Sequence, residues 1–165
     1  MSRVGIGFDV HAFDAERPLV LGGVTIEGAP GLAGWSDADV VVHSLVDALL
    51  GAAALGDLGE HFPPESVPEG SSSLDMLGAT SSMLRDSGFR VVNVDVVVVA
   101  QQVRVSPHAR AMVARMASVL GVEPDRVSVK STTTDRLGAI GRGEGIAAWA
   151  VASIEGEPSD PAATR

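Results

Sequence analysis

The run Phe89–Ala100 constrains the fold more than any other stretch, because seven of the nine residues from Val91 to Val99 are valine. β-Branched residues favour strands, and an almost unbroken run of them is typical of a strand that is buried on both faces of a sheet. Helices of this chain can cover one face. We expect a second copy of the chain to cover the other.

Hydrophobic periodicity and turn residues predict the remaining elements. The expected elements besides the valine strand are strands over residues 3–13, 18–26, 126–132 and 146–154, and helices over residues 39–55, 74–87 and 108–120. The first two strands should form a hairpin with a bulge, because Gly22 and Gly23 interrupt the second of them. The order β-β-α-α-β-α-β-β predicts an α+β fold, a two-layer α/β sandwich with a mixed sheet.

Length and charge limit the protein class. The 165 residues fit one domain, which we assign to residues 1–155, and we expect the proline-containing segment 156–165 to be disordered. A net charge of -9 argues against nucleic-acid binding. Without a signal-like segment or an apolar run of about 18 residues, we expect a cytoplasmic protein that does not bind membranes.

Asp9 and His11 stand two residues apart in the first expected strand, so their side chains should point to the same face. His43, in the first expected helix, is the best candidate for a third ligand. Because the chain has no cysteine, His, Asp and Glu are its only strong metal ligands. Three protein ligands and one open position are typical of catalytic zinc. The alternative is that these are ordinary polar residues, as short motifs often are.

Several polar residues near this site have two interpretations. Asp47 lies one helical turn after His43, where it could orient a metal-bound imidazole or simply be exposed. Asp57 stands between glycines, where it could approach a ligand or serve as an ordinary turn residue. Ser36 is a candidate helix cap. The serine-rich stretch 71–73 is expected to be mobile.

The segment Lys130–Arg136 carries hydroxyl groups at the end of an expected strand. Hydroxyls and free backbone N–H groups there can hold a phosphate, and Asp135 can share a divalent cation with it. The alternative is a strand that is simply rich in threonine. The glycine-dense loop 138–145 lacks the order of a P-loop, so nucleotide binding by that route is not expected.

Taken together, these segments resemble the 2-C-methyl-D-erythritol 2,4-cyclodiphosphate synthase family of the non-mevalonate isoprenoid pathway. The resemblance covers residues 3–154 in order, with hardly any gaps. Several motifs in one register are more specific than any single motif. The motifs that carry it are residues 7–11, 36–39, 43, 47–59, 130–135 and 141–145.

The resemblance implies a homotrimer that assembles through its sheets, with three active sites at the subunit boundaries. The expected reaction converts 4-diphosphocytidyl-2-C-methyl-D-erythritol 2-phosphate to 2-C-methyl-D-erythritol 2,4-cyclodiphosphate and releases CMP, which makes the enzyme a phosphorus-oxygen lyase. By matching positions, Asp9, His11 and His43 would hold Zn2+, and Asp135 would hold a second divalent cation, Mg2+ or Mn2+. A central cavity of the family can hold an isoprenoid diphosphate.

Matching positions also imply a set of substrate-binding residues. The set is Trp35, Ser36, Asp57, Leu58, Gly59, Phe62, Pro63, Pro64, Glu65, Ser66, Ala100, Arg104, Val105, Ser106, Ser131, Thr132, Thr133, Thr134, Ala139 and Arg142. Asp57 and Thr133 are the expected catalytic residues, and Asp47 is expected to support the metal ligands. Residues 100–106 and 131–133 match the cytidine and α-phosphate pocket, whereas Ala139 and Arg142 match the central cavity.

One departure from the family pattern keeps other functions open. Trp35 stands where the family usually has a histidine, and an indole offers one N–H but no ionisable proton. A zinc-dependent phosphohydrolase could use the same three ligands to activate water. A non-catalytic trimer that binds isoprenoid diphosphates along its axis is a third interpretation. Analysis of the reaction products would separate the three.

Overall fold

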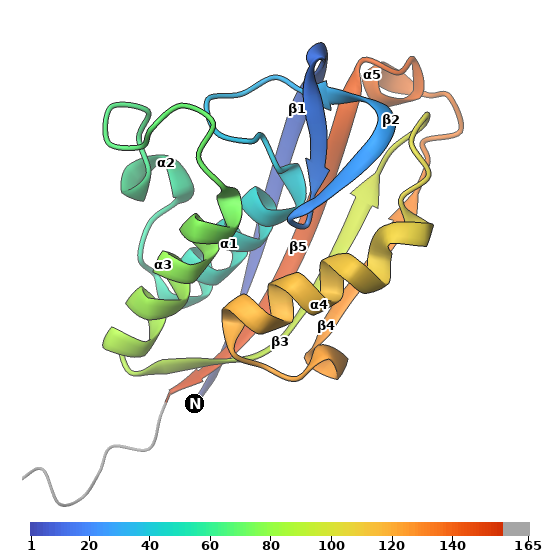
Figure 1. Ribbon diagram of the computed structural model, residues 1–165. Helices are drawn as coiled ribbons and strands as arrows, with labels where there is room; N and C mark the ends of the chain where they lie inside the picture. The colour runs from blue at the N-terminus through green and yellow to red at the C-terminus, as the bar shows by residue number, and fades with distance from the viewer. Residues whose placement is uncertain (157–165) are drawn as a thin grey trace, which may run out of the picture.

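The computed structural model describes residues 1–156 (Figure 1). In chain order its elements are β1 (Ser2–Leu21), β2 (Val24–Leu32), α1 (Val40–Ala53), α2 (Leu58–His61), α3 (Ser73–Asp86), β3 (Phe89–Val99), α4 (Ala109–Leu120), β4 (Val127–Thr132), α5 (Gly138–Gly141) and β5 (Gly145–Gly156). Short 3-10 turns precede α4 and β4. Of the segment expected to be disordered, Gly156 lies in β5, and the rest is outside the described residues.

The strands form one mixed sheet in the order β2-β1-β5-β3-β4. β3 and β4 are parallel, and the other neighbouring pairs are antiparallel. Figure 1 shows α1, α3 and α4 together on one face of this sheet. The predicted α+β architecture is therefore confirmed. Among residues 1–156, no helix combines the length and apolar character needed to span a membrane.

The first hairpin differs from the expected one. β1 continues to Leu21, which pairs with Val24, so Gly22 and Gly23 form a two-residue turn rather than a break within a strand. Their φ angles of 57° and 73° are what a type I′ turn requires, and glycine adopts them without steric cost. The pairing is irregular between residues 14 and 18, so the first half of β1 pairs with β5 and the second half with β2.

Two glycines bring β1 against α1. A Cβ atom on Gly5 or Gly7 would lie 2.0 or 1.9 Å from a backbone carbonyl oxygen of α1. The two-residue period of a strand puts Asp9 and His11 on the same face as these glycines. The sheet and the helix therefore lie close enough for side chains of β1 and α1 to form one site.

The valine strand is covered on only one face within a single chain. Val94, Val96 and Val98 are buried in the core between sheet and helices, whereas Val97 is only partly buried. The opposite face of the sheet is apolar and open, with Val4 68% and Ile6 70% exposed. The large apolar side chains on β1 and β5 that remain exposed are Val4, Ile6, Phe8, Val10, Trp149 and Val151.

Short helical elements were not predicted. The Asp57 side chain accepts the N–H of Glu60 at 2.9 Å and caps α2. The serine-rich stretch is also more ordered than expected. Ser72 caps α3 by accepting the N–H of Leu74 at 3.2 Å, and Ser73, the first residue of that helix, is completely buried.

Candidate metal centre and substrate cavities

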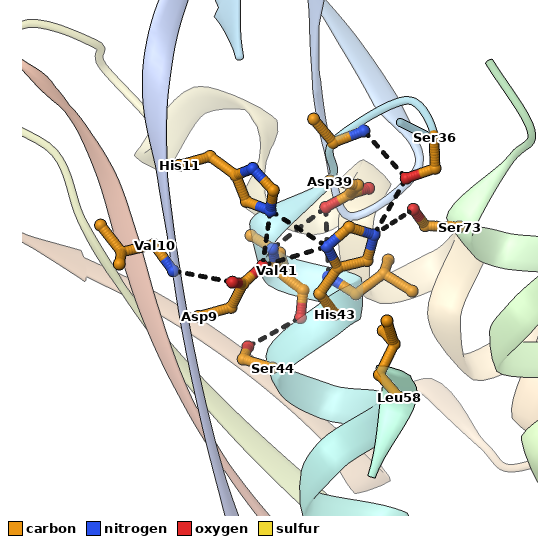
Figure 2. A network of polar contacts seen from close by, with 12 residues as sticks. Asp9, Val10, His11, Ser36, Asp39, Val41, His43, Ser44, Leu58 and Ser73 are labelled. Atoms are coloured by element: carbon orange, nitrogen blue, oxygen red, sulfur yellow. Dashed lines mark hydrogen bonds and ion pairs between the residues drawn. The ribbon is translucent and has the colours of Figure 1, made fainter. Parts of the chain in front are cut away.

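Asp9 and His11 of β1 meet His43 of α1 in front of the sheet (Figure 2). Asp9 Oδ2 lies 3.0 Å from His11 Nε2 and 3.0 Å from His43 Nδ1, and the two imidazole nitrogens are 3.3 Å apart. His43 is buried, whereas Asp9 and His11 are partly exposed. The sequence-based prediction that these three side chains converge is confirmed.

The remaining ring nitrogens show which tautomers suit the site. His11 Nδ1 lies 2.5 Å from the Ala33 carbonyl oxygen, which can only accept a hydrogen bond, so the proton is assigned to Nδ1. His43 Nε2 faces the hydroxyls of Ser73 at 2.9 Å and Ser36 at 3.2 Å. With a proton on each of these outer nitrogens, lone pairs of His11 Nε2 and His43 Nδ1 point at Asp9.

This donor set fits a divalent metal ion. Two imidazole lone pairs and a carboxylate oxygen face one another, an arrangement that a cation stabilises. Tetrahedral zinc with bonds of about 2.0–2.1 Å holds its ligand atoms about 3.3 Å apart, close to the separations seen here. In the part of the chain that the structure describes, no other group of three such side chains converges in this way.

Electrostatics within the triad favour an ionised carboxylate. Burial raises the pKa of Asp9, but His11 and His43 donate hydrogen bonds to its carboxylate when their rings are protonated, and these bonds outweigh burial and hold that pKa well below its usual range. The hydrogen bond with Asp9 raises the pKa of His11, and burial opposes this rise. When both imidazoles are neutral, the ionised Asp9 leaves the triad a partly enclosed negative site that can receive a cation.

Asp47 does not make the expected hydrogen bond with His43. Its Oδ1 accepts the N–H of Leu58 at 2.8 Å, and the nitrogens of the His43 ring are already engaged by Asp9 and by serine hydroxyls. Burial raises the pKa of Asp47. Asp47 therefore fixes the start of α2, and thereby the position of Leu58 and Gly59, rather than the imidazole.

Two cavities adjoin the triad. The larger, about 420 Å³, is lined by the three candidate ligands together with Asp47, Asp57, Leu58 and Gly59. The smaller, about 160 Å³ and mostly apolar, is lined by Trp35, Ser36, His43, Leu58, Gly59, Phe62, Pro64, Val67 and Met76. Trp35 donates its indole N–H to the Val67 carbonyl oxygen at 2.6 Å and so holds the loop after α2 beside this cavity.

A third cavity, about 310 Å³, lies at the ends of β3 and β4. It is lined by Ala100, Gln101, Gln102, Val103, Arg104, Val105, Ser106, Ser131, Thr132 and Thr133. No residue lines both this cavity and the triad cavity. Thr133 Oγ1 lies 3.4 Å from a carboxylate oxygen of Asp135, an exposed residue with a φ of 51°. Asp135 is therefore not part of the triad within one chain.

The remaining predicted site residues line none of these three cavities. They are Pro63, Glu65, Ser66, Thr134, Asp135, Ala139 and Arg142. Arg142 pairs with Glu144 at 2.6 Å on the surface. A fourth cavity, about 510 Å³ and larger than the other three, is bounded by α3, β3 and α4 and contains no residue predicted for the site.

Sequence reasoning missed the partners of the two imidazoles. The contact between His11 and the Ala33 carbonyl could not be predicted, because every residue carries a backbone carbonyl and the residue type does not single one out. Ser73 lies 30 residues from His43, and its position in a serine-rich stretch suggested mobility rather than a buried contact. Its place before a periodic apolar run was the available signal, because serine is common where helices begin.

The model of the YgbB family matches residues 2–155. This chain belongs to the YgbB family. It is 53% identical, over 93% of its length and 98% of the relative, to 2-C-methyl-D-erythritol 2,4-cyclodiphosphate synthase of Symbiobacterium thermophilum. The family match and this relative confirm the resemblance deduced from the sequence motifs. Two solved structures also resemble the fold of this chain.

The first of these structures is the bifunctional IspDF of Campylobacter jejuni, with a TM-score of 0.91 and 40% identity. The match covers 94% of this chain and 42% of that one. The second is a CDP complex of IspF from Plasmodium falciparum, with a TM-score of 0.83 and 30% identity. That match covers 95% of this chain and 97% of the other, so the YgbB fold extends over nearly all of both.

Proposed function

We propose that this chain is a lyase that converts 4-diphosphocytidyl-2-C-methyl-D-erythritol 2-phosphate to 2-C-methyl-D-erythritol 2,4-cyclodiphosphate and CMP. The observation that carries the proposal is the convergence of Asp9, His11 and His43 on a 420 Å³ cavity in a chain of the YgbB family. The 2-phosphate oxygen attacks the β-phosphorus, and the bond from that phosphorus to the oxygen shared with the α-phosphate breaks. The named activity of the Symbiobacterium relative supports this reaction.

Two cations fit this chemistry. Zn2+ is proposed for the triad, where it would act as a Lewis acid on a phosphoryl oxygen, and Mg2+ or Mn2+ for Asp135. Because the attacking group belongs to the substrate, the protein mainly positions it and offsets charge. Arg104 in the third cavity contributes positive charge to a protein whose net charge is -9.

The residues around the cavities divide the substrate between them. Asp57 and Gly59 lie beside the triad, where a carboxylate can accept from sugar hydroxyls and a glycine leaves its backbone accessible. Residues 100–106 and 131–133 form the cavity proposed for cytidine and the α-phosphate, with Thr133 as a phosphate donor. The CDP bound in the Plasmodium falciparum complex supports a cytidine nucleotide ligand.

We propose a homotrimer of single domains, each formed by residues 1–155. The open face of the sheet is apolar, and the rings of Phe8 and Trp149 pack on it at a tilt of 42°, with centroids 4.5 Å apart. An apolar face of this kind is usually covered by a partner. Assembly through the sheets would bring the triad of one chain to the third cavity of its neighbour, and Ala139 and Arg142 to a central cavity for an isoprenoid diphosphate.

Product analysis tests the proposed reaction. Metal-loaded protein is mixed with 4-diphosphocytidyl-2-C-methyl-D-erythritol 2-phosphate, and the products are identified by phosphorus NMR. Equal amounts of cyclic diphosphate and CMP are expected, and His43→Ala should form neither. An acyclic hydrolysis product would instead identify a phosphohydrolase. Ligand binding without turnover would identify a non-catalytic binding module.

Subunit mixing tests the shared site. Asp9→Ala and Asp135→Ala should each be nearly inactive, because one removes a triad ligand and the other the carboxylate proposed for the second cation. Mixed trimers of the two variants should recover part of the activity, since some boundaries then pair an intact triad with an intact Asp135. Mixed trimers that stay inactive would mean that both halves of the site come from one chain.

A further inference from the structure

The outer nitrogen of His43 faces a buried polar pocket rather than solvent. Figure 2 shows Ser36 and Ser73 on one side of the His43 ring and Asp9 and His11 on the other. Ser73 is completely buried and Ser36 is 5% exposed. Because Ser73 opens α3, this helix is in direct contact with a candidate metal ligand of α1.

Asp37 sets the direction of the hydrogen bond between Ser73 and His43. Its Oδ1 accepts from the Ser73 hydroxyl, and its Oδ2 accepts the Ser73 backbone N–H at 3.0 Å. A carboxylate can only accept, so the hydroxyl proton of Ser73 points to Asp37. The lone pairs of Ser73 Oγ are then free to accept a proton from His43 Nε2 at 2.9 Å.

We propose that Asp37 and Ser73 are positioning residues that hold His43 in its metal-binding tautomer. With the proton on Nε2, the lone pair of Nδ1 faces Asp9 and His11, whose atoms lie 3.0 and 3.3 Å away. With the proton on Nδ1, an N–H would point at the metal position and prevent coordination there. The inference rests on the proposed metal site and adds the two residues that prepare His43 for it.

Asp37→Asn is the informative substitution because an amide has an NH2 donor in place of one of the two acceptor oxygens of a carboxylate. The Asp37 carboxylate accepts two backbone N–H groups, that of Ser73 at Oδ2 at 3.0 Å and that of Asp39 at Oδ1 at 3.3 Å. If the amide oxygen keeps the shorter of these bonds, it takes the place of Oδ2. The amide NH2 then faces Ser73 Oγ and donates to it. The Ser73 hydroxyl is released to donate to His43 Nε2, which moves the proton of His43 to Nδ1.

The experiment compares Asp37→Asn, Ser73→Ala and the double variant with the wild type. Nitrogen NMR of metal-free protein reports which nitrogen of His43 carries the proton, and competition with a chelator gives the zinc dissociation constant. In Asp37→Asn the proton should move from Nε2 to Nδ1. Each single variant should bind zinc about 10- to 100-fold more weakly, the usual effect of losing such a partner. Adding Asp37→Asn to Ser73→Ala should have little further effect.

A matched control lies on the same helix. The Ser82 hydroxyl donates to the Gly78 carbonyl oxygen at 3.1 Å and does not contact His43. Ser82→Ala should therefore leave the zinc affinity and the His43 tautomer unchanged. The inference is overturned if Asp37→Asn keeps both the wild-type tautomer and an affinity within twofold, or if its effect on affinity is undiminished in the Ser73→Ala background. A wild-type protein that binds no zinc would contradict the proposed function instead, while the NMR comparison would still decide the tautomer.

Discussion

The contact between β1 and α1 at Gly7 provides the sharpest test of how the fold builds the site. A Cβ atom at this position would lie 1.9 Å from the Ser44 carbonyl oxygen and 2.7 Å from the Ala48 nitrogen. Ordinary contacts begin at 3.4 Å, so Gly7→Ala forces strand and helix apart by about 1.5 Å. Both neighbours are backbone atoms of a buried helix, so no side chain can rotate away to relieve the clash.

We expect Gly7→Ala to lower the free energy of unfolding by about 3 kcal/mol, the upper end for overpacking a core. It should also lower turnover about 100-fold. Asp9 moves away from His43 with its strand, and a misplacement of about 1 Å in an active site can lower the rate by that factor. Gly51→Ala is the matched control. Gly51 lies in α1, and a Cβ atom added there would have nothing within 4 Å, so alanine should stabilise the helix by roughly 0.5–1 kcal/mol.

Guanidinium unfolding of metal-free protein, at one fixed protein concentration, measures the change in unfolding free energy of each variant without contributions from metal binding. Steady-state kinetics of the metal-loaded variants measures the change in turnover. A Gly7→Ala protein within 0.5 kcal/mol of the wild type would refute the reasoning, as would an equal loss of stability in Gly51→Ala.

Three further predictions concern the metal, the assembly and the core. Metal analysis of His43→Ala should show zinc largely lost. His108 lies in the 3-10 turn before α4 and outside the triad, so His108→Ala should retain zinc; equal loss in both would contradict the site. Light scattering at micromolar concentration should give three times the chain mass, and Ile6→Asp should lower it by placing a charge on the open apolar face; a stable wild-type monomer would exclude the trimer. Leu49→Ala, at a completely buried position, should cost about 3 kcal/mol in denaturant unfolding, and a cost below 1 kcal/mol would contradict this packing.

The sequence predicted best those features that depend on local periodicity. The alternation of β1 placed Asp9 and His11 on one face, and the helix signals from Asp39 onward placed His43 in α1. The hairpin was placed wrongly because a glycine pair marks a break as well as it marks a type I′ turn, and only the pairing of Leu21 with Val24 decides between them.

Contacts between distant segments could not be predicted in the same way. Asp47 was expected to support His43 because the two lie one helical turn apart, yet the N–H of Leu58 takes its carboxylate. Ser73 reaches His43 only because α3 packs beside α1. Such a choice among partners depends on tertiary packing, and spacing along the chain carries no information about it.

The ends of the described chain suggest how this fold tolerates covalent fusion. The N–H of Gly156 donates to the Met1 carbonyl oxygen at 3.2 Å, and Figure 1 shows the N-terminus beside the end of β5. Asp9 lies seven residues along β1 from Ser2, roughly 23 Å away at about 3.3 Å per residue. A protein module attached at either end would therefore stand clear of the candidate metal ligands. The match covers only 42% of the bifunctional Campylobacter jejuni relative, so in that protein further chain is joined to a domain of this fold.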